Sequence, residues 1–232
     1  GDNNLSVQVF RFTDGSYLEG QDAWHMSGIH RDVYLFATPR TYIRDHYITS
    51  SLDAADGYKS GSMNVAVTMT RKSTADSGNK GVRVRLISPE GEQIAEQYMG
   101  FDFEVDNNAT GDMTLDIEFD NLKNLELWSA ETPNLYTVEI AQLDNADNEE
   151  EVFATKYGFR HIEIPADDHR VYINGKQVYF KGVDTQDTHP LHGRSIDVET
   201  MIKDITLMKQ ANVNTVRTSH YPRQAKMNAM FD

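Results

Sequence analysis

Short runs of alternating apolar and polar residues dominate the middle of the chain. Val65, Val67 and Met69 alternate with polar neighbours, and the same period of two recurs at 82–86, 115–119 and 136–140. The runs lie about ten residues apart, a spacing typical of all-β sandwiches. We therefore predict an antiparallel β-sandwich with an immunoglobulin-like arrangement over residues 41–163.

Two features inside this region bear on its role. The acidic run at 144–151 is expected to form the solvated tip of a hairpin. Trp128 lies in "LWSAETPNLY", where we expect it to pack at a strand junction. With no other aromatic platform evident, the sandwich is expected to act as a spacer without a ligand site of its own.

The first 40 residues have a weaker pattern. The alternation at 5–9 and at 33–35 predicts two short strands around a polar loop. Two strands cannot build an independent core, so this stretch is expected to be the edge of a larger β-domain. The chain begins without Met and stops on "MFD" after a predicted helix. We expect it to be cut at both ends.

In residues 164–232 the pattern changes from strands alone to strand-like runs with helical spacing between them. Asn174-Gly175 between two strand-like runs predicts a hairpin, and the second run is expected to continue to Val183. A polar loop follows, then a helix with Asp197 as its N-cap. Met201, Ile202, Ile205 and Met208 fall at helical spacing on one face of that helix. A strand at 213–217 completes a βαβ unit, whose two strands should be parallel.

The loops after these two parallel strands are the candidate functional region, because the C-terminal ends of such strands form the functional face of α/β folds. The first loop, 184–197, is far longer than the ~2–6 residues usual for this connection. The second contains "TSHYP". Together they hold groups suited to hydroxyl-rich ligands: Asp184, Gln186, Asp187, His189, His192, Arg194, Arg217, Ser219 and His220.

Several of these residues have alternative interpretations. His189 and His192 either bind a ligand or brace the loop around Pro190. A metal site made with an aspartate is a separate possibility that their spacing disfavours, since it fits no standard zinc pattern. Arg217 either serves the site or pairs with Asp184 or Asp187. His220 is expected to be functional. Asp184 and Asp187 are not expected to be a catalytic carboxylate pair, since nothing places them on opposite sides of a substrate.

Composition excludes some classes of partner. There are 36 acidic and 22 basic residues, a formal net charge of −14, and no basic cluster, which argues against nucleic acid. No apolar run is long enough to cross a membrane, so no membrane partner is expected. The absence of Cys excludes disulfides and thiolate metal sites and leaves the compartment open between cytoplasm and periplasm. Tyr179, Phe180, Val213 and Val216 should leave apolar surface that favours association.

Four motifs together resemble glycoside hydrolase family 2, and within it the large β-galactosidase branch. They are "DGSYLEGQDAWHMSGIHRDVYL", "LWSAETPNLY", "KYGFRHIEI" and "GVDTQDTHPLHG" with the following "MIKDITLMKQANVNTVRTSHYP". The resemblance spans the chain in order. It implies the end of a jelly-roll sugar-binding domain at 1–40, an immunoglobulin-like sandwich at 41–163 and the start of a TIM barrel at 164–232.

The resemblance also implies roles for individual residues. Asp22 would contact galactose and could help to hold a sodium ion, Arg217 would organise the catalytic carboxylates, and His220 would contact the sugar. The family commonly reads "GVNRHEHHP" where this chain has "GVDTQDTHP". Gln186 thus replaces a sugar-contacting His and cannot carry a charge, which bears on substrate preference.

The whole protein implied by the resemblance is a retaining β-galactosidase that acts on terminal β-galactosyl residues, uses magnesium and sodium, and forms a homo-oligomer. Both catalytic glutamates would lie downstream, so the chain alone is expected to be inactive and to bind no metal. Two alternatives stay open. One is a β-glucuronidase or another family 2 glycosidase, and the other is a non-catalytic structural or carbohydrate-binding sandwich.

Overall fold

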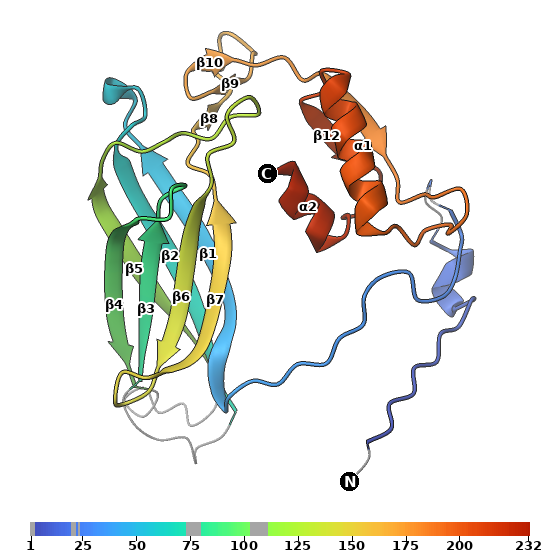
Figure 1. Cartoon of the computed structure of the whole chain (residues 1–232), viewed down its shortest axis with the longest axis horizontal. Helices are drawn as coiled ribbons and strands as arrows, with labels where there is room; N and C mark the ends of the chain where they lie inside the picture. The colour runs from blue at the N-terminus through green and yellow to red at the C-terminus, as the bar shows by residue number, and fades with distance from the viewer. Residues whose placement is uncertain (1–2, 20–21, 23, 73–79, 103–110) are drawn as a thin grey trace. The chain divides into compact units, whose positions relative to one another are not determined.

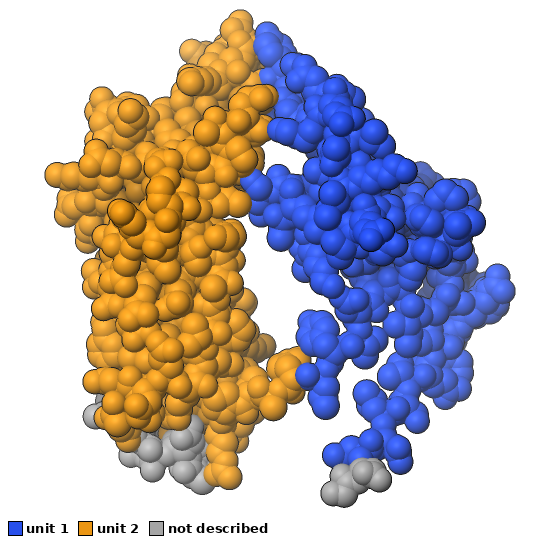
Figure 2. Space-filling view, in the orientation of Figure 1, with its two compact units in different colours: residues 1–35, 179–232 blue, residues 36–178 orange. Residues whose placement is uncertain are grey.

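The computed structural model describes residues 3–19, 22, 24–72, 80–102 and 111–232. The chain divides into two compact units, each with its own hydrophobic cluster (Figure 2). One unit comprises residues 36–178. The other combines residues 1–35 with residues 179–232, so the two ends of the chain share one unit.

The unit at 36–178 is a β-sandwich of two antiparallel sheets, which confirms the predicted fold class (Figure 1). One sheet has the order β1-β2-β5 and the other β4-β3-β6-β7. The strands are Thr41–Leu52 (β1), Gly61–Arg71 (β2), Lys80–Ile87 (β3), Gln93–Phe101 (β4), Gly111–Leu122 (β5), Tyr136–Leu143 (β6) and Glu149–Tyr157 (β7).

The apolar residues that alternate along the sequence form the core of the sandwich. The inward residues of β2, β3 and β6 are almost completely buried, while their outward neighbours are partly exposed. Burial of these side chains from both sheets drives their packing, at about 1.5–3 kcal/mol for each fully buried aliphatic residue. The central members are Met63, Val65, Val67, Met69, Val82, Val84, Leu86, Ile117, Phe119, Val138 and Ile140.

The junction before β6 is fixed by two aromatic residues. Tyr136 is buried, and its hydroxyl accepts a 2.8 Å hydrogen bond from the backbone N–H of Glu126, as in the tyrosine corner of immunoglobulin-like domains. Burial raises the pKa of the Tyr136 hydroxyl. Trp128 packs against Gly158, and the Arg160 guanidinium lies 4.6 Å from the Trp128 ring centroid. The expected packing role of Trp128 at a strand junction is confirmed.

The acidic run lies at the predicted hairpin tip, between β6 and β7. Its first part, 144–148, is a turn, whereas Glu149, Glu150 and Glu151 begin β7. Glu149 contacts Arg83, and Glu150 lies 2.6 Å from the nearly buried Lys80. Glu149 and Glu150 are exposed, as predicted. Glu151 is partly buried, and its carboxylate accepts a 2.8 Å hydrogen bond from the Ile43 N–H.

The hairpin at Asn174-Gly175 is confirmed. Both residues have positive φ (51° and 71°), as a type I′ turn requires. The turn joins Tyr172–Ile173 (β9) to Lys176–Gln177 (β10), and Ile162–Glu163 (β8) completes a small sheet. The run does not continue to Val183 as one strand. A new strand, Gly182–Thr185 (β11), starts in the other unit, whose boundary falls between residues 178 and 179.

The two strands expected near the N-terminus are not present among the described residues of 3–40. Leu5 and Val33 are 76% and 61% exposed, and no described neighbour forms a ladder with either segment. Alternation indicates which side of a strand would be buried, but a strand also needs a hydrogen-bonding partner. The described residues of 3–40 contain one 3₁₀ helix, Asp14–Tyr17. A second 3₁₀ helix, Ala54–Asp56, lies between β1 and β2.

The predicted βαβ unit is confirmed. The parallel pair β11 and Thr215–Thr218 (β12) is connected by Val198–Gln210 (α1), and Ala225–Phe231 (α2) follows. The Asp197 carboxylate accepts a 2.8 Å hydrogen bond from the Thr200 N–H, as an N-cap does. Met201 and Met227 are buried between α1 and α2, whereas Ile202 is 53% exposed. β12 starts at Thr215, later than predicted, because the Val213 N–H donates a hydrogen bond to the Met208 carbonyl at the end of α1.

Some apolar side chains remain at the surface of this unit. Tyr179 and Phe180 are 70% and 60% exposed, as expected, while Val213 and Val216 are half-buried. None of the helices in the described part of the chain has the length and apolar character needed to span a bilayer.

A pair of glycines in the four-stranded sheet provides a matched test of the packing. Gly81 and Gly100 face each other across β3 and β4. A Cβ on Gly81 would lie 2.3 Å from the Tyr98 ring, whereas one on Gly100 would meet nothing closer than 3.8 Å. Gly81→Ala should displace the ring and destabilise the sandwich by about 1 kcal/mol in urea unfolding. Gly100→Ala should be neutral or slightly stabilising. Equal losses in both variants would contradict this packing.

Glu151 offers a test of pH dependence. Burial raises the pKa of its carboxyl above the ordinary value of 4.5, although the Ile43 N–H donates to it and opposes the shift. Its ionised form is therefore disfavoured by folding, a cost that appears as pH rises through the raised pKa. Glu151→Gln should therefore raise the free energy of unfolding at pH 7 by less than about 1 kcal/mol, with a corresponding rise in Tm.

The Glu151→Gln gain should disappear as pH falls below 4.5, where the wild-type carboxyl is also neutral. The exposed Glu118 on β5 makes Glu118→Gln a control for the change in net charge. A Glu151→Gln gain that is independent of pH, or matched by the control, would show that burial of the charge is not its cause.

Candidate functional site

The candidate site is built at the end of the parallel strands β11 and β12. Their register pairs Asp184 with Arg217 and Thr185 with Thr218. The loops that follow the two strands, 186–197 and 219–224, therefore begin at the same edge of this two-stranded sheet. The functional loops chosen from the sequence lie together for this reason.

Asp187 is the buried centre of these loops. Its side chain is 1% exposed, and its Oδ1 lies 2.8 Å from the Nε of Arg223, whose side chain is also 1% exposed. The N–H direction departs from hydrogen-bond alignment, so the contact is an ion pair. A carboxylate this deeply buried requires a cation, because removing it from water is otherwise very costly. From the sequence, Arg217 is a possible partner of Asp184 or Asp187, whereas the buried partner of Asp187 is Arg223.

A second arginine reaches Asp187 from the N-terminal segment. Arg31 Nη2 lies 3.4 Å from Asp187 Oδ2 and donates a 2.6 Å hydrogen bond to the carbonyl of Pro222. The Tyr221 hydroxyl accepts from the backbone N–H of Asp187 at 3.0 Å. Nearby, Lys226 lies 2.7 Å from Asp32. The two loops and the 22–32 segment are thus joined around one carboxylate.

Asp22 is brought to the first loop by Gln186. The side-chain amide of Gln186 donates a 3.2 Å hydrogen bond to the backbone carbonyl of Asp22, which leaves the Asp22 carboxylate exposed. The amide oxygen of Gln186 is buried and has no partner among the described residues. Gln186 therefore contacts the segment that carries Asp22, through a bond that needs only a neutral donor.

Arg217 and His220 form a contiguous exposed pair. Arg217 Nη1 lies 3.4 Å from Asp184 Oδ2, both side chains being about 60% exposed, and the same nitrogen donates to the Ser219 hydroxyl at 3.4 Å. Arg217 Nη2 lies 3.3 Å from His220 Nδ1. Because a guanidinium can only donate, a hydrogen bond at this contact requires Nδ1 as the acceptor and the ring proton on Nε2. The Ser219–His220 peptide bond is cis.

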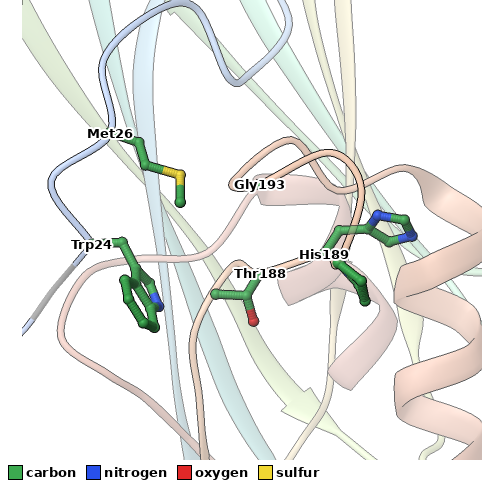
Figure 3. A pocket seen from close by; sticks show the side chains of 6 residues that line it. Trp24, Met26, Thr188, His189 and Gly193 are labelled. Carbon is green, nitrogen blue, oxygen red and sulfur yellow. The ribbon is translucent and has the colours of Figure 1, made fainter.

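A cavity of about 330 Å³ lies between the N-terminal segment and the first loop (Figure 3). We call it the Trp24 cavity. In Figure 3, Trp24 and Met26 face the loop that carries Thr188, His189 and Gly193. Trp24 is 58% exposed and Met26 54% exposed. The residues that line it are Trp24, Met26, Thr188, His189, Pro190 and Gly193.

The two histidines of the first loop act as braces. His189 Nδ1 accepts 3.1 Å hydrogen bonds from the N–H groups of Leu191 and His192, and the two imidazole rings stack at 4.3 Å. His189 and Gly193 also exchange backbone hydrogen bonds of 2.7 and 3.0 Å. Of the two sequence interpretations, bracing is the one observed. Within the described residues, no group of three or more His, Asp or Glu side chains is placed to hold a metal.

Sequence reasoning selected most of the loop residues but missed the groups that join them. Arg223 directly follows "TSHYP" and carried no separate signal, and Arg31 lies 156 residues from its partner Asp187. No pattern in the sequence distinguishes Arg31 or Arg223 from the other arginines of these segments.

Three family models match consecutive stretches of the chain. The sugar-binding domain of glycosyl hydrolases family 2 matches residues 1–39, the family's own model matches residues 41–160, and its TIM barrel domain matches residues 164–232. The β-galactosidases of Streptococcus thermophilus and Photobacterium profundum are 37% and 38% identical over the entire chain. The chain spans 21% and 22% of the lengths of these relatives.

Solved structures of a β-glucuronidase and of a putative β-galactosidase share the fold of this chain. A Bacteroides uniformis β-glucuronidase 2 superposes with a TM-score of 0.81 over 91% of this chain and 25% of its own, at 20% identity. A putative β-galactosidase from Bacteroides fragilis gives a TM-score of 0.73 over 84% of this chain and 28% of its own, at 21% identity. With a family model covering 41–160 and the two flanking domains matched in order, the chain belongs to glycosyl hydrolase family 2.

Proposed function

We propose that the whole protein is a retaining β-galactosidase that hydrolyses terminal β-galactosyl residues, and that this chain supplies part of its sugar-binding site. The observation that carries the proposal is the joining of Asp22 to the loops after β11 and β12 in one compact unit. The identity to β-galactosidases along the entire chain supports the choice of sugar.

The exposed groups suit a sugar. The Asp22 carboxylate can accept hydrogen bonds from two hydroxyls, and the His220 ring can donate one through Nε2. Arg217 is positioned by Asp184 and in turn fixes the tautomer of His220. Its remaining N–H groups can orient neighbouring carboxylates. The chain would thus bind and orient the galactosyl ring while other residues perform the bond cleavage.

The chemistry of hydrolysis requires two further carboxyl groups. In a retaining enzyme, one carboxylate attacks the sugar to form a covalent glycosyl-enzyme, and an acid protonates the leaving oxygen and then activates water. Neither role is assigned to Asp184 or Asp187, since Asp187 is buried in ion pairs and Asp184 pairs with Arg217. We therefore expect this chain by itself to be inactive.

Metal ions would be held mainly by residues outside this chain. Asp22 could give sodium one carboxylate ligand, but its backbone carbonyl already accepts from Gln186. The described residues offer no set of three carboxylate or imidazole ligands for magnesium. No step of the proposed chemistry is therefore assigned to a metal held by these residues.

A β-glucuronidase is the second candidate, and the fold shared with such enzymes is compatible with it. A glucuronide would place an additional carboxylate in the site. Arg217, one exposed cation of the site, already faces Asp184 and His220, and Gln186 is neutral. These contacts favour an uncharged galactoside.

Hydrolysis of aryl β-galactoside, β-glucuronide, β-glucoside and β-mannoside by a longer product of the same gene tests the proposal. The galactoside should be cleaved best, and the 232-residue chain should cleave none. In the longer product, His220→Ala should reduce kcat for the galactoside by roughly 10²–10³-fold if it stabilises developing charge. His46→Ala, a change on β1 of the sandwich, should leave kcat unaltered.

A preference of the longer product for the glucuronide would replace β-galactosidase with the second candidate. A longer product that cleaves no glycoside of the panel would overturn the enzymatic proposal and leave the non-catalytic alternative. An unaltered kcat in His220→Ala would remove His220 from the site.

A further inference from the structure

The N-terminal segment that carries Asp22 is held by polar contacts and not by burial. No described side chain of residues 22–32 is buried, and Trp24 and Met26, which line the Trp24 cavity, are more than half exposed. The hydrophobic cluster described for this unit is built from residues 196–231 alone. The place of the Asp22 carboxylate therefore depends on the hydrogen bonds and ion pairs that reach the segment from elsewhere in the unit.

Two of these hydrogen bonds come from the loop after β11 and end on nearby carbonyl oxygens. Gln186 donates to the Asp22 carbonyl at 3.2 Å, and Arg194 Nη1 donates to the Trp24 carbonyl at 3.2 Å. Asp22 and Trp24 are two residues apart, so the two bonds hold the stretch of backbone that presents the Asp22 carboxylate. A hydrogen bond from a charged donor is roughly twice as strong as a neutral one, so Arg194 makes the stronger of the two contacts.

Arg194 is itself anchored on the loop after β12. Its guanidinium carbon lies 4.5 Å from the Tyr221 ring centroid, within the range of a cation–π contact. The Tyr221 hydroxyl accepts a 3.0 Å hydrogen bond from the backbone N–H of Asp187, which ties the ring to the buried centre of the two loops. The planar guanidinium thus presents an N–H to Trp24 and its face to Tyr221, whereas a lysine ammonium is a single compact donor.

From these contacts we propose that Arg194 is a positioning residue of the candidate sugar site, which holds the Asp22 carboxylate in place through the Trp24 carbonyl. Arg194 acts on the sugar only through the backbone that it fixes. The inference rests on the proposed glycosidase function and adds to it the device that places an exposed carboxylate. Displacing a binding group by about 1 Å can cost on the order of 100-fold in rate, so such a device affects turnover without touching the substrate.

The test uses the longer product of the same gene and an aryl β-galactoside. Arg194→Ala should raise KM roughly tenfold with a smaller change in kcat, because a displaced Asp22 binds the ring less well in the ground state and in the transition state alike. Arg194→Lys should recover part of the loss, since it keeps a cation that can donate to the Trp24 carbonyl. Arg160→Ala, which removes an arginine from the Trp128 ring of the sandwich, is the matched control and should leave KM unaltered.

A double-mutant cycle separates positioning from a general loss of structure. Asp22→Asn removes the charge that Arg194 is proposed to place, so Arg194→Ala should change KM by less than about twofold in that background. An undiminished effect of Arg194→Ala in the Asp22→Asn background would overturn the inference, because Arg194 would then act by another route. An unaltered KM in the single Arg194→Ala variant, or a loss confined to kcat, would overturn it as well.

A measurement on the 232-residue chain tests the contact without hydrolysis. The chain has only two tryptophans, so a Trp128→Phe background makes Trp24 the sole indole reporter. Arg194→Ala should increase the quenching of Trp24 emission by acrylamide, whereas Arg160→Ala should not. Equal quenching before and after Arg194→Ala would show that Arg194 does not hold this segment and would overturn the inference. Loss of all hydrolysis in the wild-type longer product would instead overturn the proposed function.

Discussion

The candidate site depends on the burial of one carboxylate. Asp187 is 1% exposed, and it is stable there only because Arg223 and Arg31 approach it. Removing a partner from such a buried charge costs about 3–5 kcal/mol. The two arginines come from different segments, so satisfying Asp187 forces the loop after β11, the loop after β12 and the 22–32 segment to meet. Asp22, Gln186, Arg217 and His220 are carried to one region by that requirement.

The sandwich is organised by a different constraint. Its core is a set of inward-facing apolar residues from both sheets, and ion pairs such as Arg83 with Glu149 involve partly exposed side chains. Its aromatic residues are used internally, with Tyr136 at the corner before β6 and Trp128 beneath Arg160. This distribution is that of a packing domain. The groups suited to a sugar belong to the other unit.

Local patterns predicted most of the fold because they depend on neighbours in sequence. The period of two identified β2, β3, β5 and β6, Asn174-Gly175 identified the hairpin, and Asp197 identified the start of α1. The errors arose where a distant partner decides the outcome. The segments at 5–9 and 33–35 form no strand within the described residues, since alternation alone does not supply a neighbouring strand.

The candidate site was predictable in its loops but not in its connections. The positions of "TSHYP" and the 184–197 loop follow from the βαβ topology, which places both at one strand edge. That Asp187 pairs with Arg223 rather than Arg217, and that Gln186 bonds to the Asp22 carbonyl, depends on side-chain geometry that spacing does not encode. The resemblance to family 2 supplied candidate roles, while the structure supplied the contacts between them.

A double-mutant cycle between Asp187 and Arg31 tests this account most directly. Unfolding would be followed through Trp24 emission in a Trp128→Phe background, which reports on the unit that contains both residues. If Asp187 holds the segment through Arg31, the losses in unfolding free energy caused by Asp187→Ala and Arg31→Ala should be non-additive. The coupling free energy should be at least about 0.5 kcal/mol. Additive effects would contradict this account, because the 22–32 segment would then be held independently of the buried carboxylate.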